Sequence, residues 1–192
     1  MSDRNESRDL DLGQYQAYLL LLARACMPRW LRVKITAADL VQETLLKAEK
    51  GKSQFRGSPE QVKAWLRSIL GNTIVDQVRK YRGAMRDARR EQSIHQAIDE
   101  SSVRIEAWLE AKQSTPSKRL MRQERFSQLA QALRELPEDQ REALELHYFR
   151  GLKVKQVAEQ MGRTRASVAG LVRRGLADLR ANMDDSTLDM NG

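Results

Sequence analysis

Apolar residues recur at intervals of three and four along most of the chain, and this period predicts an all-α protein. In the first half, residues 15–29 form one amphipathic stretch. A second stretch begins after Thr36, where Asp39 three positions later completes a capping pair, and it ends near Gly51. The front of the chain is therefore expected to begin with two amphipathic helices.

A third helix is predicted to begin after Ser58, because Pro59 at the first helical position and Gln61 two residues later are typical of a helix start. Its apolar positions continue through Val78 into residues 79–90, where six basic residues oppose a single acid. A net charge of +5 at one helix end favours phosphate binding. The alternative is that this charge run is only a solvated helix end.

Two short amphipathic patterns within residues 136–180 predict a helix-turn-helix. The first has apolar residues at helical spacing between Val154 and Met161, and Gly162 then ends that helix. Thr164 is placed to cap the second helix. One inward stripe is predicted for the second helix, made of Val168, Leu171, Val172, Gly175, Leu176 and Leu179.

The opposite face of that second helix is predicted to be exposed, and it combines small residues with arginines. Its members are Ala166, Ala169, Gly170, Arg173 and Arg174. Small side chains let a helix approach base edges, and arginine binds phosphate or guanine. A polar surface helix of a small all-α domain is the alternative interpretation. Glycine inside a helix costs roughly 1 kcal/mol relative to alanine, which favours a packing or ligand-approach role for Gly170.

Charge and turn residues divide the chain into a front module, a connector and a rear module. The connector is acidic, with a net charge of −3 over residues 91–117. Trp108 and Leu109 allow part of it to be helical, but its serines and one proline break any long core and favour a mobile tether. The expected divisions are a disordered segment 1–11, a front domain 12–90, a flexible linker 91–116, a rear domain 117–182 and a disordered tail 183–192.

Composition favours a soluble protein with an anionic partner. The 192 residues are 41% hydrophobic and 5% aromatic, which suits small aliphatic cores. The net charge of +8 and a pI near 9.9 favour nucleic acid over an acidic membrane. The longest apolar run, residues 17–23, is far shorter than the roughly 20 residues of a membrane span. We therefore expect a cytoplasmic protein without membrane insertion.

No residue pattern indicates metal, cofactor or catalytic chemistry. Cys26 is the only cysteine, which excludes an internal disulfide, and His95 and His147 have no ligand-spaced partner. Paired carboxylates with metal ligands, a phosphate-cradling glycine loop and a nucleophile with its base are all missing from the sequence. We expect no metal, no cofactor and no catalytic residue.

Motifs in a fixed order across both modules resemble a known family. The front motifs are Asp39-Leu40-Val41-Gln42-Glu43-Thr44, Phe55-Arg56-Gly57, Ala64-Trp65-Leu66, Ile69, Asn72, Asp76 and Arg79. The rear motifs are Leu136-Pro137, Gln140-Arg141, Gly151, Val157-Ala158, Gly162, Val168 and Leu176. Over about residues 12–180 the chain resembles the extracytoplasmic-function group of the bacterial sigma-70 superfamily. The resemblance implies a region 2-like bundle and a region 4-like helix-turn-helix in a non-catalytic subunit that directs RNA polymerase to promoters and assists DNA opening.

The same resemblance implies docking on the clamp helices of the largest polymerase subunit and on the flap of the second-largest subunit. The helix over residues 39–48 has a mixed outer face, which suits a protein partner because its carboxylates would repel phosphates. An ordinary solvated face is the alternative. The predicted polymerase-binding residues are Asp39, Leu40, Gln42, Glu43 and Leu46. An anti-sigma protein is a further candidate partner.

Two DNA contacts are also implied by the resemblance. The loop over residues 51–58 and the helix after it would capture the opening minus-ten element, and the acidic linker would thread toward the RNA exit path. Phe55 suits base stacking but fits a core equally well, whereas Trp65 is expected in the core. The predicted minus-ten residues are Gln54, Phe55, Arg56, Asn72, Asp76, Arg79, Lys80 and Arg82. The predicted minus-thirty-five residues are Thr164, Arg165, Ala166, Ser167, Ala169, Gly170, Arg173 and Arg174.

The promoter sequence does not transfer from the family, because Ser68 stands where some relatives have arginine and Ala169-Gly170 replace bulkier reader residues. The main alternative function is a free-standing repressor or activator that binds operator DNA through the rear module alone. That alternative leaves the front motifs unexplained, and it predicts tight sequence-specific DNA binding by the isolated protein.

Overall fold

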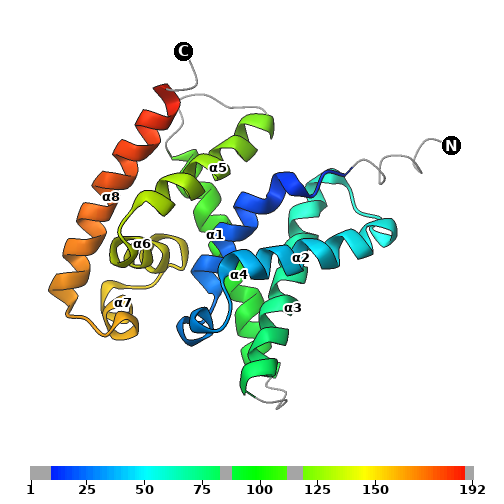
Figure 1. Ribbon diagram of the computed structural model, residues 1–192, viewed down its shortest axis with the longest axis horizontal. Helices are drawn as coiled ribbons and strands as arrows, with labels where there is room; N and C mark the ends of the chain where they lie inside the picture. The colour runs from blue at the N-terminus through cyan, green and yellow to red at the C-terminus, as the bar shows by residue number, and fades with distance from the viewer. Residues whose placement is uncertain (1–9, 83–87, 112–118, 189–192) are drawn as a thin grey trace. The chain divides into compact units, whose positions relative to one another are not determined.

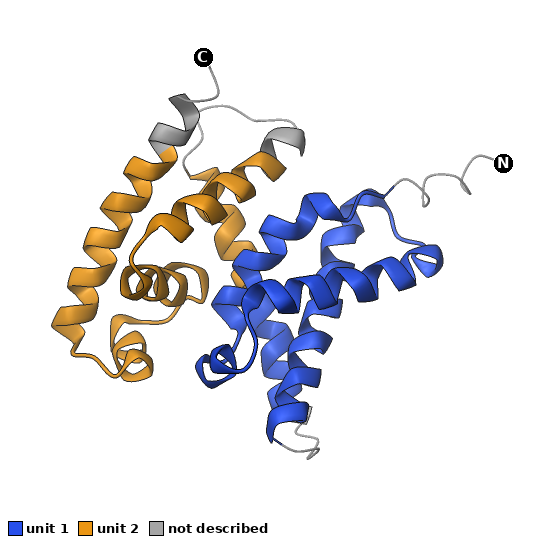
Figure 2. Ribbon diagram, in the orientation of Figure 1, with its two compact units in different colours: residues 1–99 blue, residues 100–192 orange. Residues whose placement is uncertain are grey.

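The computed structural model describes residues 10–82, 88–111 and 119–188 (Figure 1). Over these residues the regular structure is helical and contains no β-strand, so the all-α prediction is confirmed. The chain divides into two compact units, residues 1–99 and residues 100–192 (Figure 2). None of the described helices combines the length and the apolarity needed to cross a membrane.

Unit 1 is a helical bundle around an aliphatic core. Its helices are α1 (Gln16–Cys26), α2 (Ala37–Gly51), α3 (Val62–Arg82) and the first half of α4 (Ala88–Glu110). A 3-10 helix, η3 (Arg29–Val33), connects α1 to α2, and two further 3-10 turns, η4 (Lys52–Gln54) and η5 (Pro59–Gln61), lead from α2 to α3. The largest fully buried side chains of this unit are Tyr15, Tyr18, Leu19, Leu21, Leu22, Leu31, Leu40, Leu66, Leu70 and Ile74.

The helix starts of unit 1 follow the predicted capping pairs. The Thr36 hydroxyl accepts the backbone N–H of Asp39 at 3.1 Å, and the Asp39 carboxylate accepts the backbone N–H of Thr36 at 3.1 Å. The backbone N–H of Ser58 donates to the side-chain oxygen of Gln61 at 2.8 Å, with Pro59 at the first helical position. These local bonds satisfy amide groups that have no partner inside the helix, so they determine where the helices begin.

The predicted mobile tether over residues 91–116 is wrong for residues 91–110, which belong to helix α4. Ile94, Ile98, Ile105 and Leu109 recur at helical spacing and are buried. Ser101 and Ser102 complete the same stripe and are also buried, so serine here is a small packing residue rather than a helix breaker. Acidic residues on the outer face of α4 give this segment the composition of a linker, so its buried stripe was not recognised from the sequence. The rest of the predicted linker, residues 112–116, lies outside the described residues.

Contacts with α1 and α3 join the first half of α4 to unit 1. Gly71 of α3 lies directly against the His95 ring, where a side chain would not fit. The Cys26 Sγ lies 3.5 Å from the backbone oxygen of Ala97, and Arg67 Nε donates to the Asp99 carboxylate at 2.6 Å. Unit 1 therefore extends beyond the predicted boundary at residue 90.

The basic run over residues 79–90 is not one helix end. Helix α3 ends at Arg82, whereas Arg89 and Arg90 lie in the first turn of α4. Arg86 lies outside the described residues. The positive charge is therefore shared between two helix ends.

Unit 2 contains the second half of α4 and four further helices. These are α5 (Arg119–Glu135), α6 (Glu138–Leu144), α7 (Val154–Met161) and α8 (Arg165–Leu188), with a π-helical turn over Glu145–Phe149 after α6. Its core includes Phe126, Leu129, Leu133, Leu144 and Phe149, and the Trp108 ring packs edge-on against Phe149 with 6.1 Å between ring centroids.

The predicted disorder at the two ends of the chain is wrong for residues 10–11 and 183–188, which the structure describes. Leu10 is half-buried, and the Asp11 carboxylate accepts the backbone N–H of Gly13 at 2.9 Å. At the other end, α8 continues to Leu188, beyond the predicted boundary at residue 182. Residues 1–9 and 189–192 lie outside the described part of the chain.

Replacing Ile98 by alanine is expected to lower the free energy of unfolding by about 2–5 kcal/mol, because Ile98 is only 1% exposed. Chemical denaturation followed by circular dichroism measures this loss. Val103→Ala is the matched control on the same helix, since Val103 is 68% exposed and its truncation should change stability by less than about 0.5 kcal/mol. Equal small effects for both variants would restore the tether interpretation.

Candidate functional site

The helix-turn-helix in unit 2 has the local geometry that its sequence predicted. Helix α7 ends at Gly162, which adopts a left-handed conformation with φ 64° and ψ 36°. This conformation suits glycine because it has no Cβ. The Thr164 hydroxyl then accepts the backbone N–H of Ser167 at 3.1 Å and so caps α8. The turn between the two helices is thus determined by one glycine and one threonine.

Helix α8 separates into a buried stripe and an exposed face. Of the predicted inward stripe, Leu176 is half-buried and the other members, Val168, Leu171, Val172, Gly175 and Leu179, are buried. The predicted minus-thirty-five residues are all at least partly accessible: Thr164, Arg165, Ala166, Ala169, Arg173 and Arg174 are exposed, and Ser167 and Gly170 are half-buried. The structure therefore brings these eight residues together around the outer face and first turns of one helix.

Gly170 lies on the accessible side of α8. The three heavy atoms nearest to a methyl group added there all belong to the Arg174 side chain, and the closest is its Nη1 at 3.2 Å. The nearest obstacle to a side chain at this position is therefore the end of a flexible arginine rather than a packed neighbouring helix. Of the two roles weighed for Gly170, the geometry therefore favours close approach of a ligand over packing.

An aromatic pair defines the loop between α2 and α3. The Phe55 and Trp65 rings stack with centroids 4.7 Å apart and an interplanar angle of 28°, and both residues are half-buried. Trp65 was expected in the core, but its side chain is only half-buried. A methyl group at Gly57 would lie 2.5 Å from the Phe55 ring, so Gly57 allows the ring to fold back onto Trp65. Arg56 Nη1 donates to the Ser53 carbonyl at 2.6 Å.

Asn72, Asp76 and Lys80 occupy one exposed row of α3, spaced by four residues. Asp76 does not present a bare negative charge, because its Oδ2 lies 2.9 Å from Lys47 Nζ of α2. Burial lowers the pKa of Lys47, but Asp76 and Glu43 together raise it above its usual value. Arg79 pairs with Glu91 of α4. Lys80 and Arg82 are therefore the more accessible cations at this end of α3.

The predicted polymerase-binding set on α2 is only partly accessible. Asp39, Gln42 and Leu46 are exposed, with Leu46 at 64%. Leu40 is fully buried in the bundle core, so its inclusion in the set is wrong. Position 40 falls on the same helical stripe as the core residues Val41, Thr44 and Ala48.

Glu43 is committed to contacts inside unit 1. One of its carboxylate oxygens accepts from Gln77 Nε2 at 2.7 Å, and the other lies 3.0 Å from Lys47 Nζ. Glu43 therefore joins α2 to α3, which weakens its assignment as a direct contact for a partner.

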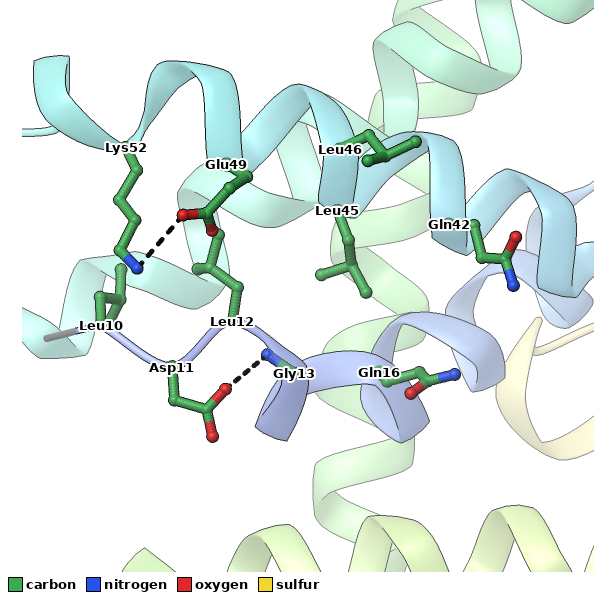
Figure 3. Close-up of a pocket in the computed structure, with 10 residues that line it drawn as sticks. All are labelled: Leu10, Asp11, Leu12, Gly13, Gln16, Gln42, Leu45, Leu46, Glu49 and Lys52. Carbon is green, nitrogen blue, oxygen red and sulfur yellow. Dashed lines mark hydrogen bonds and ion pairs between the residues drawn. The ribbon is translucent and has the colours of Figure 1, made fainter.

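A groove that the sequence did not reveal runs beside the exposed face of α2 (Figure 3). It has a volume of about 550 Å³. One wall comes from the segment before α1 and the other from α2 and the residue after it. The lining residues are Leu10, Asp11, Leu12, Gly13, Gln16, Gln42, Leu45, Leu46, Glu49 and Lys52. No local motif marks this groove, because it forms only where two distant segments lie side by side.

An exposed helix-turn-helix face in one unit and a basic helix end with an aromatic pair in the other define a two-unit DNA-binding protein of the helix-turn-helix class. A family model described as Sigma-70 region 2 matches residues 14–94, and one described as Sigma-70, region 4 matches residues 126–179. Together they cover most of the chain. The chain belongs to the sigma-70 family.

Curated proteins of similar sequence are named sigma factors. The RNA polymerase sigma factor YlaC of Bacillus subtilis is 28% identical, over 97% of this chain and 96% of its own length. The ECF RNA polymerase sigma factor SigL of Mycobacterium tuberculosis is 26% identical, over 78% of this chain and 75% of its own length. A solved structure of the sigma factor RpoE with the anti-sigma factor NepR from Bartonella quintana aligns at 23% identity and a TM-score of 0.35, over 90% of this chain and 94% of that chain.

Replacing Thr36 by alanine is expected to raise the pKa of Asp39 toward 3.8, because it removes the side-chain hydrogen bond that is the larger of the two Thr36 contacts lowering that pKa and leaves the backbone one in place. A carboxylate whose folded pKa is depressed stabilises the fold above its unfolded pKa, and this stabilisation is lost as the pH falls through the folded value. Proton titration by NMR measures the shift. Thr36→Ser keeps the hydroxyl and should leave the Asp39 pKa low; an unchanged pKa in Thr36→Ala contradicts the capping account.

Proposed function

We propose that this chain is an extracytoplasmic-function sigma factor: it binds core RNA polymerase, directs the enzyme to specific promoters and assists DNA opening. The observation that carries this function is the presence of region 2 and region 4 in order within one chain. The exposed reading face of α8 agrees with it. In this proposal the chain is a non-catalytic subunit, and nucleotide chemistry belongs to the polymerase.

The polymerase docks on the outer face of α2 in this proposal. Asp39, Gln42 and Leu46 supply an accessible carboxylate, an amide and a large exposed apolar side chain. The groove beside them adds apolar depth through Leu12 and Leu45. Protein interfaces combine apolar anchors with a polar rim in this way. The flap of the second-largest subunit and an anti-sigma protein stay predictions of the family resemblance.

Unit 1 captures the opening minus-ten element through the loop between α2 and α3. The Phe55 and Trp65 rings, stacked and half-buried, offer an apolar platform that suits an unstacked base. Gln54, Arg56 and Asn72 are exposed nearby in the loop and on α3, where they can read base edges or bind phosphate. The ion-paired Asp76 and Arg79 act as supports rather than as direct contacts.

Unit 2 reads the minus-thirty-five element with the outer face of α8. The capped N-terminus of α8 favours a phosphate, because its first amide groups and the helix dipole both attract negative charge. Ala166, Ala169 and Gly170 permit close approach to base edges, and Arg173 with Arg174 supplies the positive charge.

Replacing Leu46 by alanine is expected to weaken core binding while leaving the fold intact. Leu46 is 64% exposed, so its truncation removes little from the core of unit 1. Loss of an interface anchor costs at least about 1 kcal/mol, roughly a fivefold rise in Kd. A titration of labelled protein with core polymerase measures this change. Equal affinities for Leu46→Ala and wild type argue against docking on α2.

The proposed function predicts that purified chain added to core polymerase initiates transcription at a defined set of sites on genomic DNA. Sequencing the transcript 5′ ends identifies these sites, and a shared upstream motif is the expected result. Start sites no different from those of core polymerase alone, together with tight sequence-specific DNA binding by the isolated chain, would favour the repressor alternative.

Loss of a base contact in Arg173→Ala is expected to weaken promoter binding by about 1–3 kcal/mol. In the same assay, this variant should therefore produce fewer transcripts from the identified sites. Arg180→Ala is the matched control, because Arg180 is also an exposed arginine of α8 but lies two turns further from the helix-turn-helix. Initiation at the wild-type rate by Arg173→Ala would rule out the assigned contact.

A further inference from the structure

The connection between α1 and α2 carries positive charge that the proposed function does not use. Residues 27–36 contain three basic residues and no acid. Two of these basic residues, Arg29 and Arg32, lie in η3, and Lys34 follows it as an exposed side chain. Val33 beside them is 84% exposed. This segment is therefore a basic surface rather than a buried turn.

A contact between one basic and one aromatic side chain joins this connection to α3. The guanidinium carbon of Arg82, the last residue of α3, lies 4.3 Å from the centroid of the Trp30 ring of η3. This distance is well within the range of a cation–π contact. Trp30 is half-buried and Arg82 is exposed, so the pair lies at the surface of unit 1.

The stacked arrangement leaves Arg82 able to bind an anion. A guanidinium that rests on a ring uses its flat face, whereas its five N–H donors point outward in its own plane. No carboxylate among the described residues pairs with Arg82, in contrast to Arg79, which pairs with Glu91. The Trp30 ring therefore restricts the Arg82 side chain without consuming its hydrogen-bond donors.

A second cation lies on an aromatic ring at the same helix end. Lys80 Nζ is 5.3 Å from the centroid of the Tyr81 ring, and Tyr81 is 40% exposed. Lys80 is two positions from Arg82, so it lies on a different side of α3 and is not counted with it. We name the Arg82–Trp30 pair and the exposed Lys34, four residues after Trp30, the Trp30 patch.

We propose that the Trp30 patch binds the backbone of double-stranded DNA and that Trp30 is a positioning residue that holds Arg82 toward a phosphate. The inference rests on the proposed function, because it extends the DNA-binding surface of α3 onto the connection between α1 and α2. The patch has two cations, Lys34 and Arg82, and no acidic member, which complements a polyanion. A backbone contact of this kind is independent of base sequence and sensitive to salt.

The test measures binding of the full-length chain to a fluorescent 30-base-pair duplex of arbitrary sequence, by anisotropy over a series of salt concentrations. Arg82→Ala is expected to weaken binding and to reduce the slope of log K against log salt by about 0.9, the value for one phosphate contact. Trp30→Leu keeps every charge, and it is expected to weaken binding in the same direction by about two- to tenfold. Trp30→Phe retains an aromatic face and is expected to restore most of the affinity.

A double-mutant comparison separates positioning from a general effect on the fold. If Trp30 acts through Arg82, Trp30→Leu should cause no further loss in an Arg82→Ala background. Arg134→Ala is the control for charge, since Arg134 is an exposed arginine near the end of α5 whose guanidinium contacts Gln131. Its effect on affinity should be smaller than that of Arg82→Ala. Wild-type affinity in Trp30→Leu, or an equal further loss in the Arg82→Ala background, overturns the proposal.

Two further outcomes complete the test. The Trp30 variants could fail to fold, which circular dichroism would show. In that case Lys34→Gln and Arg82→Ala, both at exposed positions, test the proposal. Each must reduce the slope of log K against log salt, and an unchanged slope rejects the patch. Co-elution of each variant with core polymerase is measured in parallel. Lost co-elution with intact duplex binding would make the patch a polymerase surface, whereas failure of the wild-type chain to co-elute counts against the proposed function instead.

Discussion

The close packing of α8 against α6 determines which face of α8 is exposed in unit 2. A methyl group at Gly175 would lie 3.1 Å from Cβ of Gln140 and 3.2 Å from Cδ1 of Leu144, closer than the roughly 3.5–4.0 Å of ordinary carbon contacts. Glycine at this position lets the two helices approach. Arg173 and Arg174 lie on the side of α8 opposite the stripe that contains Gly175. Burying that stripe therefore leaves both arginines exposed. The face that we propose reads DNA is thus exposed as a consequence of packing on the opposite side.

In unit 1, ion pairs between helices decide which charged residues remain available for partners. Lys47 of α2 reaches both Asp76 of α3 and Glu43 of its own helix, and Arg79 reaches Glu91 of α4. These contacts support the packing of α2, α3 and α4. Asp39, Gln42 and Leu46, which we propose contact a protein partner, remain exposed, as do Lys80 and Arg82, which we propose contact DNA. In this proposal, support and recognition fall to different side chains of the same helices.

Sequence reasoning succeeded where a few neighbouring residues decide the structure and failed where distant segments meet. The capping pairs at Thr36 and Ser58 and the glycine stop at Gly162 were predictable, because each depends on groups within three residues. Leu40 was misassigned because it was taken into the polymerase-binding set with its motif, although its helical spacing places it on the inward stripe. Helix α4 was missed because buried serines and an acidic outer face resemble a linker in composition.

The sequence by itself determined the all-α class, the two modules and the inward stripe of α8, since helical period and capping are local properties of the chain. Only the tertiary structure decided that Glu43 and Arg79 are committed to ion pairs, that residues 10–16 and α2 enclose a groove, and that Trp30 lies under Arg82. The reason is physical: these contacts join residues far apart along the chain, and their partners depend on how helices pack rather than on any spacing in the sequence.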